Sequence, residues 1–413
     1  MSRAKKLACL FAAVLLLLPN VISCGIAQGQ PGDMQESLQS DRESDPLREP
    51  DTQAQSSQTE QASTSPVTAA PDTGQDTEPQ DSATQSATAP EEPAGEIVRA
   101  DVLGYTYPTL EEDLALLEQA YGNHFSYESI GKSVDGREIY ACVVGNPDAP
   151  EKIMITGGIH GREYLSSLLV MKQIEHYLSK YQTGSFGGMR YAEMFERFAF
   201  YVLPMINPDG VMLALAGIES VQTPEVRQTL EEIFADNKEV GLTNANDINA
   251  YFAYNWKSNA NGVDLNRNFA LKNWDEVRTG ILSPCFRNYK GPSAASEPET
   301  QAVSAWVQSL GSIKCMLAFH TAGQVVYWDC GMTGAVRQQT FDLAEAVCAH
   351  TGYQFIYDKH LDASLNDWMT LELGIPAVTV ELANVIYPMP PSEIDSAWEQ
   401  AGALWVVAAQ LFW

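Results

Sequence analysis

A strand, a polar turn and a helix follow one another near the middle of the 413-residue chain. The apolar residues 152–156 are typical of a short buried strand, and residues 164–171 are typical of a helix. The turn between them, residues 157–163, has the sequence Gly-Gly-Ile-His-Gly-Arg-Glu. At a spacing of three, His160 and Glu163 can point together at the carboxyl edge of a sheet, where open α/β sheets bind ligands.

An imidazole and a carboxylate that converge in this way are suitable ligands for Zn²⁺. A catalytic zinc needs a third protein ligand, and His320 is the best candidate because it ends the apolar segment 313–319 in a similar context. Two histidines and one glutamate, with a fourth position open for water, form a common catalytic zinc site. A His-x-x-Glu pair alone is more often an ordinary hydrogen-bonded feature, so the other motifs must support this interpretation.

Strands and helices alternate through residues 101–413, which predicts one α/β domain around a mostly parallel sheet. Residues 217–250 are acidic and are interpreted as an insertion near the rim of the site. The segment Asn-Pro-Asp-Gly at 207–210 is typical of a turn. Strands are predicted at 125–134, 137–144, 152–156, 198–204, 313–319, 325–328 and 375–382, and helices at 110–121, 164–180, 224–235, 296–310, 336–351, 363–373 and 394–411.

The N-terminus has the features of a bacterial lipoprotein signal, predicted as residues 1–23. Three basic residues precede the apolar run 7–19, which is too short for a stable membrane span. The run leads to Val-Ile-Ser-Cys, which resembles a lipobox, so Cys24 is the predicted lipidation site. We therefore expect an extracytoplasmic protein with a lipid anchor in the cell membrane. The alternative is an ordinary signal peptide with an incidental cysteine.

Residues 24–100 are predicted to be a disordered tether. They are rich in Gln, Ser, Thr, Asp, Glu and Pro, and the first aromatic residue after them is Tyr105. Such a segment cannot bury enough apolar surface to offset its chain entropy. The formal net charge of the whole chain, −28, argues against nucleic acid as a partner. Cysteines 142, 285, 315, 330 and 348 show no paired spacing, which is a poor disulfide framework.

A polar loop and an apolar strand carry the other candidate site residues. Arg267 could form two charge-assisted bonds with a carboxylate, and Asn266 could add an amide donor, although a structural salt bridge is the commoner role of a lone arginine. Asp264 could accept the free N–H of a metal-bound imidazole. Glu381 lies in an otherwise apolar strand, where partial burial would raise its pKa toward the range of a general base.

These motifs resemble, in identity and order, the zinc carboxypeptidases of the carboxypeptidase A type. The resemblance covers about residues 105–413, and its motifs are His160-Gly-Arg-Glu163, Asn-Pro-Asp-Gly at 207–210, Gly-Val-Asp-Leu-Asn-Arg-Asn-Phe at 262–269, His320-Thr and Glu381. It implies a mixed, mainly parallel sheet with helices on both faces, and one Zn²⁺ on His160, Glu163 and His320. It also implies that Glu381 is the general acid/base of a zinc-activated water.

The same resemblance implies the substrate contacts. Asn266 and Arg267 would clamp a terminal carboxylate, and Arg162 would line the substrate cleft. His-Thr-Ala-Gly at 320–323 and Tyr-Trp at 327–328 are similar to the bacterial γ-D-glutamyl-diaminopimelate peptidases, so the expected substrate is a cell-wall stem peptide. The alternatives are a zinc deacylase of small N-acyl substrates and a non-catalytic peptide-binding lipoprotein.

The chain departs from the family pattern at two positions. Asn261 stands where many members have an arginine that faces the developing oxyanion, so Lys257, Arg162 or the zinc alone would take this role. The equivalent of the family's mobile tyrosine falls at Tyr357, Lys359 or His360, and the sequence does not choose between them. By the same counting, residue 366, an asparagine, falls near the base of the specificity pocket.

Overall fold

The computed structural model describes residues 96–99, 104–357, 360–384 and 387–413. The predicted signal peptide, Cys24 and the predicted tether up to residue 95 lie outside the described residues. The backbone N–H groups of Ile97 and Val98 donate to the carboxylate of Glu175, and Val98 is buried. Contact with the folded part therefore begins a few residues before the predicted domain start at residue 101.

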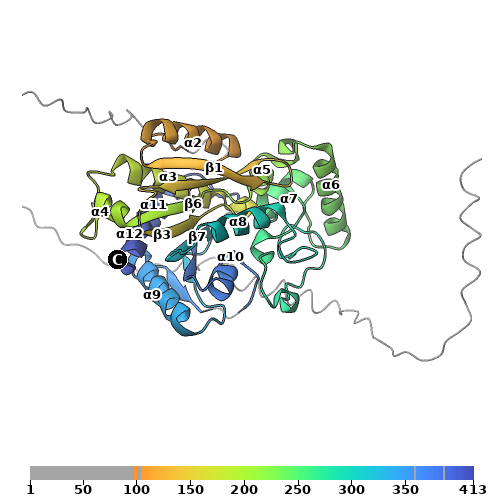
Figure 1. Ribbon diagram of the computed structural model, residues 1–413. Coiled ribbons are helices and arrows are strands. Elements are labelled where there is room, and N and C mark those ends of the chain that lie inside the picture. The colour runs from red at the N-terminus through yellow and green to blue at the C-terminus, as the bar shows by residue number, and fades with distance from the viewer. Residues whose placement is uncertain (1–95, 100–103, 358–359, 385–386) are drawn as a thin grey trace, which may run out of the picture.

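One eight-stranded sheet forms the centre of the described part, in the order β1-β2-β6-β3-β7-β10-β8-β9 (Figure 1). The pairs β6/β3, β3/β7, β7/β10 and β8/β9 are parallel, whereas β1/β2, β2/β6 and β10/β8 are antiparallel. The prediction of a mixed, mostly parallel sheet is confirmed. The strands are β1 (Phe125–Lys132), β2 (Glu138–Val144), β3 (Glu151–Thr156), β6 (Phe198–Leu203), β7 (Cys315–Thr321), β8 (Val325–Tyr327), β9 (Gln354–Ile356) and β10 (Ala377–Leu382), with a separate small hairpin of β4 (Ser185–Phe186) and β5 (Met189–Arg190).

Helices cover both faces of this sheet. They are α2 (Tyr107–Tyr121), α3 (Tyr164–Ser179), α4 (Tyr191–Arg197), α5 (Pro208–Ala216), α6 (Pro224–Glu239), α7 (Ile248–Asn255), α8 (Pro298–Ser309), α9 (Gly334–Thr351), α10 (Leu365–Asp367), α11 (Glu393–Ala401) and α12 (Leu404–Leu411). Short 3₁₀ turns occur at η2 (Gly161–Glu163), η3 (Gly217–Ser220), η4 (Leu265–Arg267) and η5 (Trp274–Glu276), and a π-helical turn, η6 (Trp368–Glu372), continues α10. No helix in the described ranges has both the length and the apolar character needed to cross a bilayer.

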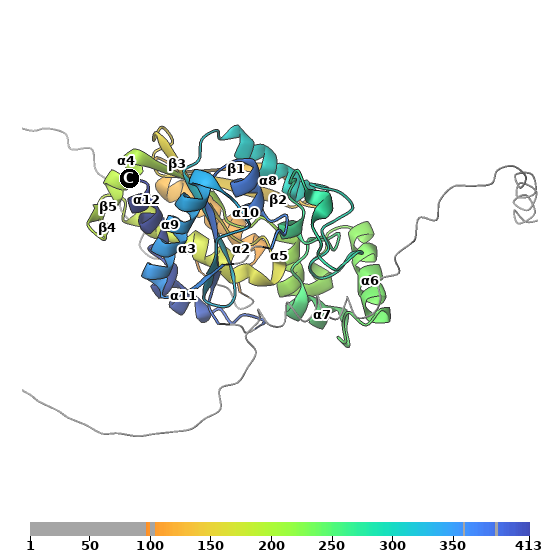
Figure 2. The same ribbon diagram turned by 90° about the horizontal axis from the view of Figure 1, so that it is seen from below.

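Side chains of the central strands alternate between two cores, as expected for strands buried on both faces. Val378 and Val380 of β10 belong to the core that α3, α9, α11 and α12 cover, whereas Ala377 belongs to the core beneath α8 and the segment that follows η4. The two views show these layers on either side of the sheet (Figures 1 and 2). Every second residue of β7 and β10 therefore faces the α8 side.

The acidic segment 217–250 packs together with the residues that follow it. Helices α6 and α7 lie at the end of the molecule opposite to α4 and the C-terminus in both views (Figures 1 and 2). Apolar residues of this region form a third core, which includes Tyr251, Phe252 and Trp256. Trp256 accepts through its carbonyl a hydrogen bond from the Arg162 N–H, at 2.8 Å, so this third core is attached directly to the 157–163 turn.

Three predicted elements differ from the structure. The segment at 207–210 is not a free turn, because Asn207 caps α5 by accepting a 2.8 Å hydrogen bond from Gly210 N–H and Pro208 begins the helix. The predicted helix 394–411 is two helices, α11 and α12, interrupted at Gly402. The predicted helix 363–373 begins only at Leu365 and is mostly a π-helical turn.

Candidate active site

The turn after β3 is held by close backbone packing. Gly158 has φ +60°, and a Cβ there would lie 2.3 Å from Ser167 Oγ. A Cβ on Gly161 would lie 2.3 Å from the carbonyl oxygen of Gly210 in α5. Side chains at these two positions would push the turn away from its supports. The glycines thus allow His160 and Glu163 to approach each other across a single short turn.

His160, Glu163 and His320 lie together in the interior. The Nδ1 atom of His160 is 3.0 Å from Glu163 Oε1, and the Nδ1 atom of His320 is 3.0 Å from Glu163 Oε2. The candidate ligand atoms all lie within 4.8 Å of one another, and the three residues are buried. The predicted ligands from β7 and from the turn after β3 are therefore brought together.

This donor set fits a zinc ion. Ligands at about 2.0–2.2 Å from a tetrahedral zinc lie about 3.3–3.6 Å from each other. The present spacing needs only small side-chain movements to reach that arrangement. Both imidazoles turn Nδ1 toward the shared carboxylate, which leaves Nε2 of His160 free to face Asp264.

Asp264 fixes the orientation of His160. Its Oδ1 is 3.2 Å from His160 Nε2, while its Oδ2 accepts a 2.9 Å bond from Asn288 N–H. Burial opposes ionisation of Asp264, but the attraction of His160 and the hydrogen bond to it hold its pKa well below the usual range. This is the contact predicted for a carboxylate behind a metal-bound imidazole.

Opposite charges in this cluster stabilise the ionised forms of Glu163 and His160. Burial tends to raise the pKa of Glu163, but attraction to His160 and Lys257 holds it well below its ordinary value. Burial tends to lower the pKa of His160, yet the two carboxylates Glu163 and Asp264 raise it. The pKa of His320 is lowered, chiefly by burial. Glu163 is therefore ionised, as a metal ligand must be.

Glu381 lies beside the cluster on the adjacent strand. It is paired with His320 in the parallel register of β10 and β7, and residues in register on neighbouring strands project to the same face. Its Oε2 is buried and has no hydrogen-bond partner among the described residues. Burial, followed by the charge of Glu163, raises the pKa of Glu381 to about 8. An unpaired acid with a pKa in this range is suited to proton transfer.

Lys257 supplies a cation at the same place. Its Nζ is 3.3 Å from Glu163 Oε1, and its side chain is 24% exposed, so it reaches both the cluster and solvent. Hydrogen bonds of its backbone N–H to Phe286 and of its carbonyl to Gly161 fix the residue against the turn. In contrast, the Asn261 amide donates to Glu297 at 2.8 Å. Of the positions left open by the sequence, Lys257 is the one in contact with a predicted ligand.

Arg162 contacts an aromatic residue that the sequence analysis missed. Its guanidinium carbon lies 4.0 Å from the ring centroid of Tyr387, and it donates to the carbonyl of Tyr254 at 2.9 Å. The Tyr387 hydroxyl donates to the carbonyl of Thr321, the residue after His320, at 2.6 Å. The available signal was a tyrosine before a proline, six residues after Glu381.

The predicted carboxylate clamp lies on η4, directly after Asp264. The Asn266 Oδ1 accepts a 3.1 Å bond from Leu365 N–H, which ties η4 to α10. The Arg267 guanidinium is 3.3 Å from the carboxylate of Asp362 and 19% exposed. The salt bridge considered as the alternative role of Arg267 is thus present, and both groups remain accessible to solvent.

Two of the three candidates for the mobile tyrosine, Tyr357 and His360, lie at the surface. Tyr357 is exposed, and its ring centroid lies 5.6 Å from that of Trp328. His360 is also exposed. Lys359 lies outside the described residues.

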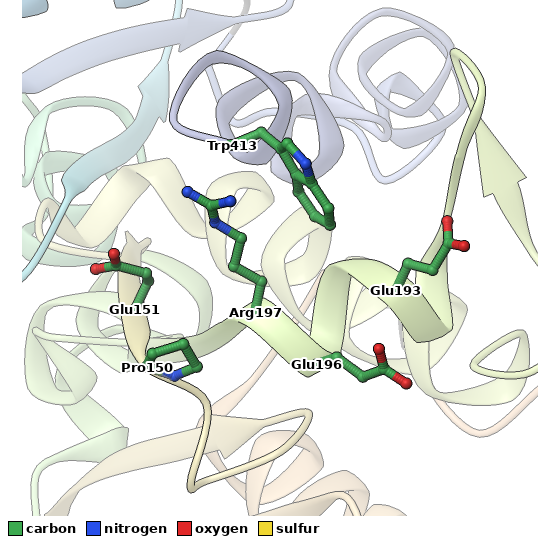
Figure 3. A pocket seen from close by; sticks show the side chains of 6 residues that line it. All are labelled: Pro150, Glu151, Glu193, Glu196, Arg197 and Trp413. Atoms are coloured by element: carbon green, nitrogen blue, oxygen red, sulfur yellow. The ribbon is translucent and has the colours of Figure 1, made fainter.

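A hollow of about 440 Å³ occurs elsewhere on the surface, as Figure 3 shows. It lies near the first residue of β3, at the opposite end of that strand from the 157–163 turn, and contains none of the predicted ligands. It is therefore separate from the candidate active site. Its lining residues are Pro150, Glu151, Glu193, Glu196, Arg197 and Trp413.

Comparison with known proteins agrees with this geometry. A model of the zinc carboxypeptidase family matches residues 110–403. The chain is 27% identical over 309 residues to γ-D-glutamyl-L-diamino acid endopeptidase 1 of Lysinibacillus sphaericus, which covers 74% of this chain and 72% of that protein. It is 27% identical over 319 residues to a zinc carboxypeptidase of Simulium vittatum, covering 71% of this chain and 93% of that protein.

The fold is similar to that of solved carboxypeptidase structures. The structure of thrombin-activatable fibrinolysis inhibitor aligns with a TM-score of 0.58 and 19% identity, and the alignment covers 77% of each chain. The carboxypeptidase A of Helicoverpa armigera aligns with a TM-score of 0.54 and 17% identity, over 77% of this chain and 76% of that one. The chain belongs to the zinc carboxypeptidase family, and it is a metallopeptidase that uses one zinc ion.

Proposed function

We propose that this enzyme hydrolyses a peptide bond near a free carboxylate in cell-wall stem peptides. The observation that carries the proposal is the position of Glu381, a half-buried acid in register with His320 whose Oε2 is buried and has no hydrogen-bond partner among the described residues. A group at this position can exchange a proton with a water and with a leaving amine at the predicted zinc site. The name of the Lysinibacillus sphaericus relative, a γ-D-glutamyl-L-diamino acid endopeptidase, supports the substrate class.

In this proposal His160, Glu163 and His320 hold the zinc ion, and Asp264 orients His160. The chemistry that a bound zinc ion supplies is that of a Lewis acid, which acidifies water and polarises a carbonyl group. Glu381 takes a proton from the attacking water and then delivers it to the leaving amine. The raised pKa of Glu381 allows it to act in both directions near neutral pH.

Lys257 is proposed to stabilise the oxyanion that develops on the scissile carbonyl. Its ammonium already lies against Glu163, on the exposed side of the ligand cluster. A fixed cation at the developing negative charge stabilises the transition state more than the ground state. Arg162, held by Tyr387 and the Tyr254 carbonyl, is proposed to line the path of the substrate.

Asn266 and Arg267 are proposed to hold the free carboxylate of the substrate. A guanidinium is well suited to a carboxylate because it donates two parallel hydrogen bonds. Holding the far end of the substrate places the scissile bond next to Glu381 and lowers the entropic part of the barrier. A deacylase of small N-acyl amino acids would use the same contacts.

The substrate class can be tested with three groups of compounds. Purified zinc-loaded enzyme is incubated with stem peptides, ordinary dipeptides and N-acyl amino acids, and the products are identified by mass spectrometry. We expect cleavage of the stem peptides at the highest kcat/KM. Preferential cleavage of N-acyl amino acids would instead establish the deacylase, and cleavage of ordinary dipeptides alone would reject the cell-wall substrate.

We also propose that the protein is extracytoplasmic and attached to the cell membrane through lipid on Cys24. The proposal rests on the lipobox-like sequence at 21–24 and on the acidic segment that follows it. The full-length protein should incorporate a labelled fatty acid and sediment with membranes. Cys24→Ser should abolish the label, and labelling that persists in this variant would contradict the assignment.

A further inference from the structure

Arg267, one of the two residues of the proposed carboxylate clamp, forms an ion pair with an acid, Asp362. The two charged groups are 3.3 Å apart, with side chains 19% and 40% exposed. A substrate carboxylate that binds Arg267 must compete with Asp362 and leaves that negative charge without its partner. An accessible acid at this place therefore opposes a substrate whose end carries only a carboxylate.

We propose that Arg267 and Asp362 together bind a terminal residue that carries an ammonium group near its carboxylate. The carboxylate binds Arg267, and the ammonium takes the place of Arg267 as the partner of Asp362. A diamino acid at the end of a peptide has this combination of charges. The inference rests on the proposed function, because it concerns the end of the same substrate.

The backbone around Asp362 is held in place by the neighbouring segment. Its N–H donates to Asp367 at 2.9 Å, and Asp367 in turn forms a capping box with Ser364 at the start of α10. The Asn266 bond to Leu365 N–H joins the same segment to η4, which carries Arg267. Arg267 and Asp362 therefore belong to one hydrogen-bonded framework, formed by η4 and residues 362–367. This framework begins at Asp264, which contacts His160.

The framework also contacts β10, the strand that carries Glu381. Asn366 donates from its side chain to Thr379 Oγ1 at 2.7 Å. Thr379 precedes Glu381 by two residues on β10, so both side chains project to the same face of the sheet. Neither is fully buried. Arg267 and Asp362 are thus linked through one helix turn to the strand that carries the proposed proton-transfer group.

The energetic cost of opening this pair is small. Exposed ion pairs contribute about 0–1 kcal/mol, since both groups are well solvated when separated. A substrate with both charges replaces the Arg267–Asp362 pair by two new ion pairs, one between its carboxylate and Arg267 and one between its ammonium and Asp362. A substrate without the ammonium leaves Asp362 without this partner. The selectivity expected from one solvent-accessible charge pair is about two- to fivefold.

Binding to an inactive variant tests this inference independently of hydrolysis. Zinc-loaded Glu381→Gln is titrated calorimetrically with peptides that differ only in the last residue: lysine, diaminopimelate or norleucine, whose apolar side chain lacks the ammonium group. We expect the ammonium-bearing peptides to bind about two- to fivefold more tightly than the norleucine peptide. Preference for lysine as well as diaminopimelate indicates recognition of the ammonium alone, and preference restricted to diaminopimelate indicates recognition of the adjacent pair of charges.

Asp362→Asn in the same background should abolish the preference, because it weakens the binding of the ammonium-bearing peptides. Glu219→Gln is the matched control, because Glu219 is an exposed acid also 3.3 Å from an arginine, Arg227 of α6. This control should leave the preference unchanged. Equal binding of all peptides, or a preference that survives Asp362→Asn, would overturn the inference. Failure of the wild-type enzyme to cleave any peptide would reject only the proposed function.

Discussion

Glu381 of β10 stands directly beside His320 of β7 in a parallel register, and its buried Oε2 has no hydrogen-bond partner within the part of the chain that the structure describes. Two neighbouring strands thus bring a predicted metal ligand and an unpaired acid to the same face of the sheet. A buried carboxyl oxygen without a hydrogen-bond partner is costly, and proteins rarely keep one without a function. This relationship underlies the predictions below.

Removal of zinc should destabilise the protein without unfolding it. In the absence of the ion, Glu163 still bonds both imidazoles and the Thr321 N–H, so no ligand is left unpaired. Zinc at 100 times its Kd would contribute about 2.7 kcal/mol to the free energy of unfolding. Calorimetry with and without a chelator should show a lower Tm for the apoprotein but a single cooperative transition. An unchanged Tm would argue against a zinc site in the folded protein.

Substitution of Asp264 by asparagine should weaken zinc binding. Asn presents an amide in place of the carboxylate that accepts from His160 Nε2, so the imidazole loses its charged partner. Loss of such a partner typically reduces metal affinity by about 10- to 100-fold. The affinity can be measured by competition with a chromophoric chelator. Asp236→Asn, on the exposed face of α6, is the control and should bind zinc as the wild type does.

Lys257 should contribute to turnover and little to metal binding. Lys257→Met removes the cation but retains much of the aliphatic chain, and kcat should fall by about 100- to 1,000-fold. Lys257→Arg should recover part of this loss, because it restores the charge. Zinc content should stay at one ion per chain in both variants. A methionine variant with normal kcat would reject the role of Lys257.

Glu299 should make stability depend on pH. It is fully buried, accepts from Val134 N–H and the Asn259 amide, and its pKa is raised to about 8 by burial and by the charge of Asp209. A pKa raised above its unfolded value gives stability that is complete below about pH 4.5 and is lost as the pH rises through about 8. The loss is of the order of 5 kcal/mol for such a shift.

Denaturant titrations from pH 5 to 8 test this assignment. The free energy of unfolding of the wild type should fall over this range, and the fall should be smaller for Glu299→Gln, which cannot ionise. Glu345→Gln, at an exposed position of α9, serves as the control and should follow the wild type. Parallel curves for wild type and Glu299→Gln would contradict the prediction.

The sequence was sufficient for the parts of the fold that depend on local pattern. Short apolar runs followed by polar, glycine-containing turns located β3 and β7, and an apolar run located β10, and hence the edge where His160 and His320 meet. The role of Glu381 followed from the resemblance to a known family, whereas its pairing with His320 was not predicted, because register between distant strands is not encoded in either strand alone.

Other features depend on tertiary contacts and could not be predicted. Asn207 begins a helix, whereas a turn was predicted. Its side-chain amide is held there by hydrogen bonds to the carbonyls of Ile159 and Ser258. The break between α11 and α12 places Gly402 against Trp398, where a Cβ would be crowded. The contact of Arg162 with Tyr387 joins residues 225 positions apart, and the local sequence around either residue does not predict it.

The central claim is tested most directly by zinc content and turnover measured together on Glu381→Gln. The substitution keeps the shape of the side chain and leaves His160, Glu163 and His320 untouched. We expect one zinc ion per chain, as in the wild type, with kcat lower by a factor of about 1,000 or more, since general acid/base catalysis alone contributes about 10²–10⁴. Full zinc content with wild-type kcat on a substrate that the wild type cleaves would contradict the account.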